Sequence, residues 1–346
     1  MQECNMFCTL GPSCKDPKVI AELINQGITT IRINFSHGTC ADHTEYYNNI
    51  KEAEKIAGRK VHIFGDIQGP KLRINKFAGG PQQVVKGQSF ILDESPLDGD
   101  NTRVYLPHPE FFDVCQVGDA ILINDGIVVV ECTKNHTNAA GIREIVTKVV
   151  REGTISDRKG VALPARVLPL STTSPRDVEC IENACAIGIE CIMLSFIQTA
   201  DDVRAAKKII NGRAKVMPKI EKPTAVLDLH EICKECEIML IARGDLAVET
   251  KLCRVNYLQK YITDVCRQHN VKIVCATQHL ESLIELETPT IAEMSDIANA
   301  IYDGCDGILV TGECASGLNS ANTISWLKKA ILATGATMNP DAPLFK

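Results

Sequence analysis

The sequence predicts an α/β protein in which eight parallel strands close into a barrel, with a small β domain inserted after the third strand. Short, almost continuously apolar runs alternate with helix-like segments along most of the 346 residues, as in a sheet covered by helices. Eight such units favour a closed (β/α)8 barrel. Between the third and fourth units the pattern changes to period-two runs with glycine and proline between them. Periodicity alone leaves an open doubly wound sheet as the alternative.

The predicted strands of the barrel are the apolar runs 4–10, 29–35, 61–67, 191–196, 215–220, 238–243, 272–277 and 307–311. The first helix shows how the segments between them are recognised. Asp16 is a good N-cap residue, Pro17 takes the first helical position and Gly27 ends the helix. The same kinds of signal predict helices from Ser174-Pro175 to Gly188, from Thr199 to Gly212, from Thr290 to Gly304 and from Asn322 to Leu332.

Residues 74–165 form the predicted inserted domain. The runs FIL, VYL, AILIN, IVVVE and REIVTKVV have the period of strands, and Asp125-Gly126 is typical of a hairpin turn. We therefore expect residues 1–73 and 166–346 to form the barrel and residues 74–165 to form a small β-barrel lid.

Composition excludes several classes of protein. Lys plus Arg number 37 and Asp plus Glu 43, and the net charge of −6 does not attract nucleic acid or anionic lipid. No apolar run reaches the roughly 18 residues that span a bilayer, and the N-terminus lacks the pattern of a secretion signal. The 16 cysteines include one CxxC, Cys233 to Cys236, and most sit where small hydrophobic residues pack. We expect a cytoplasmic protein with reduced thiols and no nucleic-acid or membrane partner.

Polar residues at the strand ends indicate a site at one rim of the barrel, where the carboxyl ends of the strands meet. Arg32 and Lys219 lie within strand ends, where a lone cation is costly to bury, so an anionic partner is expected. Glu221 and Asp245 end neighbouring strands and are the ligands that a hard divalent cation such as Mg²⁺ prefers. Each residue alone could make a structural ion pair, but together they favour phosphoryl transfer.

The sequence resembles the pyruvate kinases over nearly all of its length. The motifs that carry the resemblance are CTLGPS (8–13), RINFSHG (32–38), GDIQGPKLR (65–73), KGVALP (159–164), MPKIE (217–221), ARGDLAVE (242–249), CATQHLES (275–282) and AEMSDIANAIYDGCDGILVTGE (292–313). The resemblance implies a barrel with a β-barrel lid and transfer of phosphate from phosphoenolpyruvate to ADP, giving pyruvate and ATP in glycolysis. It implies Mg²⁺ or Mn²⁺ as cofactor and leaves room for a homo-oligomer through the barrel domain.

The resemblance also implies roles for individual residues. The phosphoryl group in transfer would be bound by Arg32 and Lys219, and the divalent cation by Glu221 and Asp245. Substrate binding would use the amides around Gly244 and Asp245 together with Ser195, and Thr277 would lie on the face where enolpyruvate is protonated. The nucleotide-side contacts would be Pro12, Asn34, His37, Lys159 and, on the lid, Asp125.

Several departures from the family pattern qualify these expectations. On the nucleotide side, Ser316 stands where relatives have a lysine, and Asp42 stands where an aromatic residue usually follows the SHGT motif. Relatives normally continue into a C-terminal effector domain, which we expect this chain to lack. These departures leave a catalytically weak homologue with a binding or regulatory role as the alternative function. A metal-dependent lyase is a third reading, which gives Arg32, Lys219 and the lid no clear role.

The loop after the third strand indicates whether the protein needs a monovalent cation. Relatives that need K⁺ bind it through residues matching Asn34, Ser36, Asp66 and the carbonyl of Ile67, and have a glutamate where this chain has Lys71. The pattern, with Ile74 in place of threonine, resembles the K⁺-independent branch of the family. We expect the Lys71 ammonium to supply the positive charge that K⁺ provides elsewhere, so that K⁺ is not required.

Overall fold

The computed structural model describes residues 2–124, 126–164, 166–169, 173–340 and 344–345. Eight strands form a closed barrel: β1 (Asn5–Thr9), β2 (Ile28–Asn34), β3 (His62–Asp66), β12 (Cys191–Leu194), β13 (Lys215–Ile220), β14 (Ile238–Ala242), β15 (Lys272–Ala276) and β16 (Gly307–Val310). Neighbouring strands are parallel and follow chain order, and β16 pairs with β1 to close the ring. The predicted barrel is confirmed, and an open sheet is excluded.

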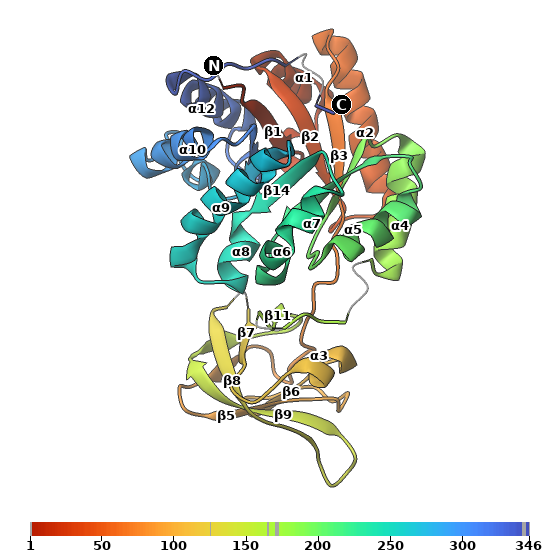
Figure 1. The fold of residues 1–346 in the computed structure, drawn as a ribbon, viewed down its shortest axis with the longest axis vertical. Coiled ribbons are helices and arrows are strands. Elements are labelled where there is room, and N and C mark those ends of the chain that lie inside the picture. The colour runs from red at the N-terminus through yellow and green to blue at the C-terminus, as the bar shows by residue number, and fades with distance from the viewer. Residues whose placement is uncertain (1, 125, 165, 170–172, 341–343, 346) are drawn as a thin grey trace.

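Helices cover the outside of the barrel (Figure 1). They are α1 (Pro17–Gln26), α2 (Cys40–Ala57), α4 (Pro175–Ile187), α5 (Ala200–Ile210), α6 (Pro223–Leu227), α7 (Leu229–Cys233), α8 (Arg243–Glu249), α9 (Val255–Gln268), α10 (Ile291–Asp303), α11 (Gly312–Ala315) and α12 (Ser320–Ala333). Two predicted helix ends are wrong by about one or two positions. Asn211 takes the left-handed conformation and ends α5 before Gly212. Asn319 caps the amide of Asn322, so α12 starts at Ser320.

The barrel strands are buried on both faces, which explains their continuous apolar runs. Phe7, Phe64, Met193, Met217 and Leu309 belong to one core cluster, and a second, larger cluster joins the strands to the surrounding helices. Because both faces of the strands are filled with apolar side chains, polar chemistry is left to the strand ends. The described residues include all 16 cysteines, and none of them forms a disulfide.

A second unit follows β3 and precedes β12 (Figure 1). Its strands are β4 (Gln82–Val84), β5 (Ser89–Asp93), β6 (Arg103–Tyr105), β7 (Ala120–Ile123), β8 (Val128–Thr137), β9 (Arg143–Arg151), β10 (Gly153–Ile155) and β11 (Val161–Ala162). They form a six-stranded sheet in the order β11-β7-β8-β9-β5-β6 and a two-stranded sheet of β4 and β10. A core of its own, with Phe90, Phe111 and Val130, holds this unit together.

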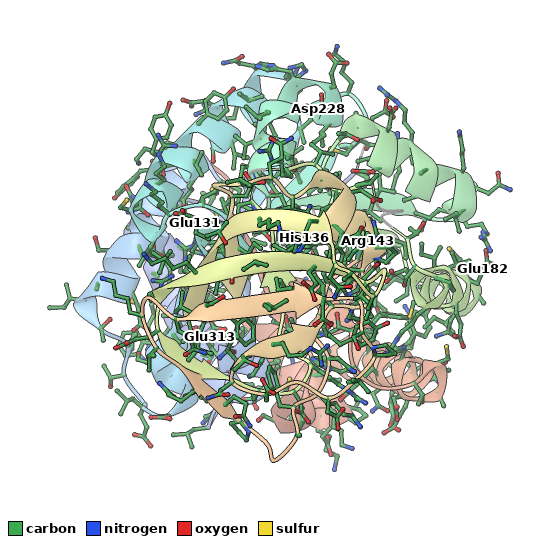
Figure 2. The ribbon with its side chains drawn as sticks, turned by 90° about the horizontal axis from the view of Figure 1, so that it is seen from below. Glu131, His136, Arg143, Glu182, Asp228 and Glu313 are labelled. Atoms are coloured by element: carbon green, nitrogen blue, oxygen red, sulfur yellow. The ribbon has the colours of Figure 1, made fainter. Side chains whose placement is uncertain are left out.

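Figure 2 looks at this inserted unit from below, with its sheet in front of the barrel and Glu131, His136 and Arg143 on it. The period-two runs of the sequence are found in its strands, and β7 and β8 pair antiparallel as the hairpin signal predicts. Asp125 lies in their connection, outside the described residues. The sequence did not predict α3 (Pro109–Val114), which starts with a proline and buries Phe111 and Phe112. Over the described part of the chain, no helix has the length and apolar character to cross a membrane.

Candidate active site

A cleft of about 310 Å³ opens at the carboxyl ends of the barrel strands. Its lining includes Thr9, Arg32, Asn34, Asp66, Lys219, Glu221, Asp245, Thr277 and Thr311, which lie at or just after the ends of β1, β2, β3, β13, β14, β15 and β16. The volume suits a small phosphorylated acid. The barrel therefore brings Arg32, Lys219, Glu221, Asp245 and Thr277 to one cleft, as their positions in the sequence predict.

Lys219 is the centre of a buried network of charges. Its Nζ lies 3.0 Å from Glu221 Oε1 and 3.2 Å from Asp66 Oδ2, and it donates to Ser195 Oγ at 2.8 Å. Arg32 Nε donates to Asp66 Oδ2 at 2.7 Å. Burial acts to lower the pKa of Lys219, but Asp66 and Glu221 outweigh it and hold that pKa above its ordinary value. The side chain is therefore a fixed ammonium that faces the cleft.

Asp66 balances the two cations. Burial acts to raise its pKa, but Lys219 and Arg32 outweigh burial and keep the pKa below its ordinary value. The carboxylate is only 2% exposed, so it holds both cations in place without offering itself to solvent. Arg32 Nη1 also donates to Thr9 Oγ1 at 3.1 Å, which orients the guanidinium along the edge of the cleft. Arg32 and Lys219 are thus arranged in advance for an anion.

Glu221 and Asp245, the predicted metal ligands, fit a divalent cation. Burial raises the pKa of Glu221 to about 7; Lys219 opposes this shift and Asp245 adds to it. Phe196 N–H donates to Glu221 Oε2 at 2.6 Å, but Oε1 is buried and receives no hydrogen bond of good geometry, although Lys219 is close. A buried carboxylate oxygen without a donor, lining the same cleft as a second carboxylate, suits Mg²⁺ or Mn²⁺.

Two carboxylates are enough protein ligands for Mg²⁺, which keeps several waters and binds one or two carboxylates together with substrate oxygens. Among the described residues, no group of three or more His, Cys, Asp or Glu side chains is placed to hold a metal ion.

Thr277 is held in an unusual backbone conformation at the end of β15. Its φ is +74° and that of Gln278 is +56°, which is strained for a β-branched residue. The Thr277 carbonyl accepts from Arg243 Nε at 3.2 Å and from Nη2 at 2.5 Å, and its Oγ1 accepts from the Gly244 amide at 2.8 Å. The predicted carboxylate-binding amide of Gly244 is thus bonded to the side chain of Thr277 in this structure.

A second cavity of about 400 Å³ adjoins the first and shares Thr9, Asn34 and Ala315 with it. Pro12, Asn34 and His37, which are predicted nucleotide contacts, line it together with Lys15. Lys159 does not line it: it lies in the connection before β11, where its carbonyl accepts from Ile74 N–H at 3.0 Å. Asp125, the remaining predicted contact, is outside the described residues.

Asp42 and Ser316, the two departures from the family pattern, have local structural roles. The Asp42 carboxylate accepts from the Thr39 amide at 2.7 Å and completes the capping box that starts α2. Ser316 is exposed, and its Oγ donates to the Gly312 carbonyl at 3.1 Å at the end of α11. Asp42 also lines the second cavity.

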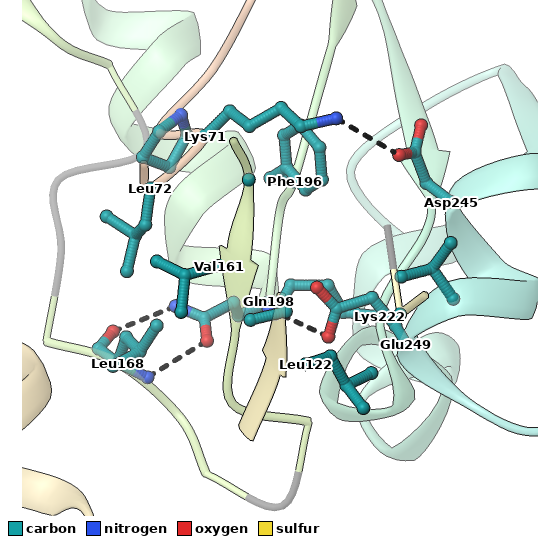
Figure 3. Close-up of a pocket in the computed structure, with 15 residues that line it drawn as sticks. Lys71, Leu72, Leu122, Val161, Leu168, Phe196, Gln198, Lys222, Asp245 and Glu249 are labelled. Atoms are coloured by element: carbon teal, nitrogen blue, oxygen red, sulfur yellow. Dashed lines mark hydrogen bonds and ion pairs between the residues drawn. The ribbon is translucent and has the colours of Figure 1, made fainter. Parts of the chain in front are cut away.

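The residues of the predicted monovalent-cation site are already partly engaged. The Ile67 carbonyl accepts from Ser195 Oγ at 2.7 Å, and the Asn34 side chain accepts from Ser36 N–H at 3.1 Å. Lys71 Nζ lies 3.8 Å from Asp245 Oδ1 and 5.8 Å from the centre of the Phe196 ring (Figure 3). The ammonium is thus directed at Asp245, a predicted metal ligand that lines the cleft, and shares a neighbouring pocket with Asp245 and Phe196.

Sequence reasoning missed the residues that support Thr277. Arg243 Nη1 donates to Asp296 Oδ1 at 2.7 Å, and Asp296 Oδ2 lies 2.9 Å from Nδ1 of the fully buried His279. In the sequence, Arg243 stands out only as part of the motif ARGDLAVE, and nothing in the local pattern connects it to α10. The available signal was His279, because it follows Thr277 by two positions in the motif CATQHLES.

Comparison with known proteins agrees with this geometry. Residues 1–324 match the family model "Pyruvate kinase, barrel domain". The chain is 41% identical to a pyruvate kinase of Methylorubrum extorquens, over 90% of this chain and 64% of that protein. It is 37% identical to one of Agrobacterium vitis, over 95% and 69%. A crystal structure of a pyruvate kinase from Cryptosporidium parvum aligns with a TM-score of 0.91 at 30% identity, over 96% of this chain and 69% of that one.

The chain thus spans about two thirds of the length of these relatives, from 64% to 69%. The matches cover the barrel and the inserted unit alike. They confirm the resemblance to the pyruvate kinases that the sequence motifs carry. The chain belongs to the pyruvate kinase family.

Proposed function

We propose that this chain transfers the phosphoryl group of phosphoenolpyruvate to ADP, producing pyruvate and ATP. The P–O ester bond of phosphoenolpyruvate breaks, and a P–O bond forms to an oxygen of the β-phosphate of ADP. The enolate that leaves takes up a proton at its methylene carbon. The observation that carries the proposal is the buried Lys219 ammonium, which lies between Asp66 and Glu221 and faces a cleft of suitable size.

Each side chain has a defined task in this mechanism. Lys219 and Arg32 stabilise charge on the oxygens of the transferring group, because phosphoryl transfer passes through a loose transition state. Thr277, in its strained conformation, borders the face where the enolate is protonated through water. A divalent cation such as Mg²⁺, held by Glu221 and Asp245, would neutralise phosphate and carboxylate oxygens of the substrates. The inserted unit would exclude water, which otherwise competes with ADP.

The experiment is an assay of pyruvate formation, coupled to lactate dehydrogenase, with phosphoenolpyruvate and Mg²⁺ and with ADP or GDP as acceptor. We expect turnover that depends on the acceptor. Pyruvate formation at the same rate without nucleotide, or no formation at all, would contradict the proposal. The network around Lys219 favours an enzyme over the alternative of a weak homologue. We further propose that the reaction serves glycolysis in the cytoplasm, where free thiols such as these stay reduced.

We also propose that K⁺ is not required, because the Lys71 ammonium supplies a positive charge at the cleft. Activity with Mg²⁺ should then be near full in buffer free of Na⁺ and K⁺, with a tetramethylammonium salt to hold the ionic strength. Lys71→Glu should lower activity and make the remaining activity respond to K⁺. Strong activation of the unmodified protein by K⁺ would contradict this proposal and leave the phosphoryl-transfer assignment standing.

A further inference from the structure

Each of the two predicted metal ligands faces a lysine in this structure. Lys219 Nζ lies 3.0 Å from Glu221, and Lys71 Nζ lies 3.8 Å from Asp245. Lys219 is buried among its partners, but Lys71 and Asp245 are 29% and 39% exposed, so this second pair can open. Figure 3 shows the long Lys71 side chain extending past Phe196 to reach Asp245.

Lys71 belongs by its backbone to the connection between the barrel and the inserted unit. Its amide donates to the Gly69 carbonyl at 2.9 Å, and the next residue, Leu72, is part of the core of the inserted unit and accepts from Val161 N–H at 3.0 Å. Gly69 has a φ of +66°, and a Cβ there would lie 2.5 Å from the Ser195 carbonyl oxygen, so this turn requires glycine. The side chain of Lys71 therefore reaches Asp245, which lines the cleft, from a backbone that leads into the inserted unit.

Phe196 contacts both Glu221 and the lysine that faces Asp245. Its N–H donates to Glu221 Oε2 at 2.6 Å, and its ring lies beside the Lys71 ammonium, 5.8 Å from centroid to Nζ. The residue has a φ of +55°, which is rare for a bulky side chain and which places amide and ring on the two different partners. The contact favours the present position of Lys71, since an ammonium is attracted to an aromatic face.

We propose that the Lys71 ammonium is an internal counter-ion of Asp245, which a divalent cation bound by Glu221 and Asp245 must displace, so that cation binding is coupled to the connection of the inserted unit. The inference rests on the metal site of the proposed function. Two cations cannot share Asp245 at close range without repulsion, because a bound divalent ion lies about 2 Å from its ligand oxygens. The displaced ammonium can then bind an anionic substrate.

Binding of Mn²⁺ to the full chain without substrates, followed by calorimetry, tests the displacement. Lys71→Met keeps an unbranched apolar side chain next to Phe196 and removes the charge. We expect the dissociation constant for Mn²⁺ to fall by about threefold to tenfold, the scale for a partly exposed ion pair. Lys71→Arg should stay near the wild-type value. Lys76→Met, at an exposed lysine of the same connection, controls for net charge and should change nothing.

Either of two outcomes with Lys71→Met would overturn the inference. The variant Glu221→Gln distinguishes a failure of this inference from a failure of the proposed function. Unchanged or weaker Mn²⁺ binding in a folded Lys71→Met variant contradicts displacement. Glu221→Gln should weaken Mn²⁺ binding strongly; if it does not, the metal site itself is misplaced and the proposed function loses its cation. If Glu221→Gln weakens binding but Lys71→Met has no effect, only the present inference fails.

Amide hydrogen exchange tests the coupling to the connection, independently of affinity. In the wild type, Mn²⁺ should change the exchange of residues 69–74, because the side chain anchored there is released from Asp245. In Lys71→Met the same segment should respond to Mn²⁺ much less. A wild-type segment that does not respond to saturating Mn²⁺ contradicts the coupling.

Discussion

The two halves of the proposed active site, the cleft and the cavity that adjoins it, are built differently. On the side proposed to bind the phosphoryl group, Asp66, Ser195, Lys219 and Glu221 are buried and bonded to one another. On the side proposed to bind the nucleotide, Pro12, Lys15, His37 and Asp42 line the adjoining cavity and are exposed. Thr9 and Asn34 lie at the boundary and line both cavities.

This difference separates residues that we expect to act in the chemical step from residues that we expect to act in substrate binding. Charges that are buried and held by several partners do not reorganise when charge develops in a transition state, so they lower the barrier. Exposed side chains along a cavity are solvated before binding and gain less from a ligand. We therefore expect substitutions on the phosphoryl side to change turnover, and substitutions on the nucleotide side to change the Michaelis constant for ADP.

The largest expected effect follows from Lys219→Met. The variant removes the ammonium that faces the transferring group, and kcat should fall by about 10²- to 10³-fold, the loss typical of one electrostatic stabiliser. The fold and Mn²⁺ binding should be retained, which circular dichroism and calorimetry can check. Lys215→Met is the matched control, since Lys215 is at the opposite end of the same strand, half exposed and paired with Glu237. More than about a tenth of wild-type kcat in Lys219→Met would contradict the assigned role.

Asp296→Asn tests whether the support behind Thr277 matters to the reaction. The change leaves the buried Arg243 without its carboxylate partner. Arg243 should then hold the Thr277 carbonyl less firmly by its hydrogen bonds. We expect kcat to fall about tenfold, as positional errors at a reacting face are costly. Asp303→Asn, on the same helix and paired with Lys260, is the control. An equal loss in both variants would mean that α10 acts only through stability, which urea unfolding measures directly.

His37→Gln probes the other half of the cleft. His37 is exposed and lines the second cavity, so its loss should raise the Michaelis constant for ADP by about threefold to tenfold, the value of one modest hydrogen bond. The kcat and the Michaelis constant for phosphoenolpyruvate should stay the same. A fall in kcat without a change in the Michaelis constant for ADP would contradict the proposed difference between the two halves of the site.

The smallest expected effect concerns pH and the buried His279. Burial and Arg243 act to lower the pKa of His279, but Cys275 and Asp296 outweigh them and raise it above the ordinary value. A raised pKa contributes stability that is fully present below the unfolded value of about 6.5 and is lost as pH rises through the folded value. The difference in unfolding free energy between wild type and His279→Gln should therefore shrink as pH rises above about 6.5.

The control for this comparison is His230→Gln, since His230 is an exposed histidine near the start of α7. The difference in unfolding free energy between wild type and His230→Gln should not show this dependence on pH. Urea unfolding at several pH values provides the measurement. A difference that grows with pH for His279→Gln would reverse the sign and contradict the interpretation of this network.

Much of the fold could be predicted because its signals are local. Asp16, Pro17 and Gly27 mark the ends of α1 where they were expected, and the capping boxes at Ser174 and Thr290 start α4 and α10. The helix α3 was missed because it is short and lies within period-two runs. The start of α12 was misplaced because Asn319 and Asn322 are both plausible caps, and only the backbone selects between them.

By itself the sequence determined the barrel and the identity of the residues at its rim, because strand period, helix caps and strand-end polar residues are properties of neighbouring positions. Only the tertiary structure decided how those residues are paired. Lys219 meets Asp66 across 153 positions of chain, and Arg243 meets Asp296 across 53. Lys71 could have pointed into solvent, and its direction toward Asp245 depends on Phe196 and on the turn at Gly69. Such contacts depend on side-chain rotamers and on distances between elements, which no local pattern encodes.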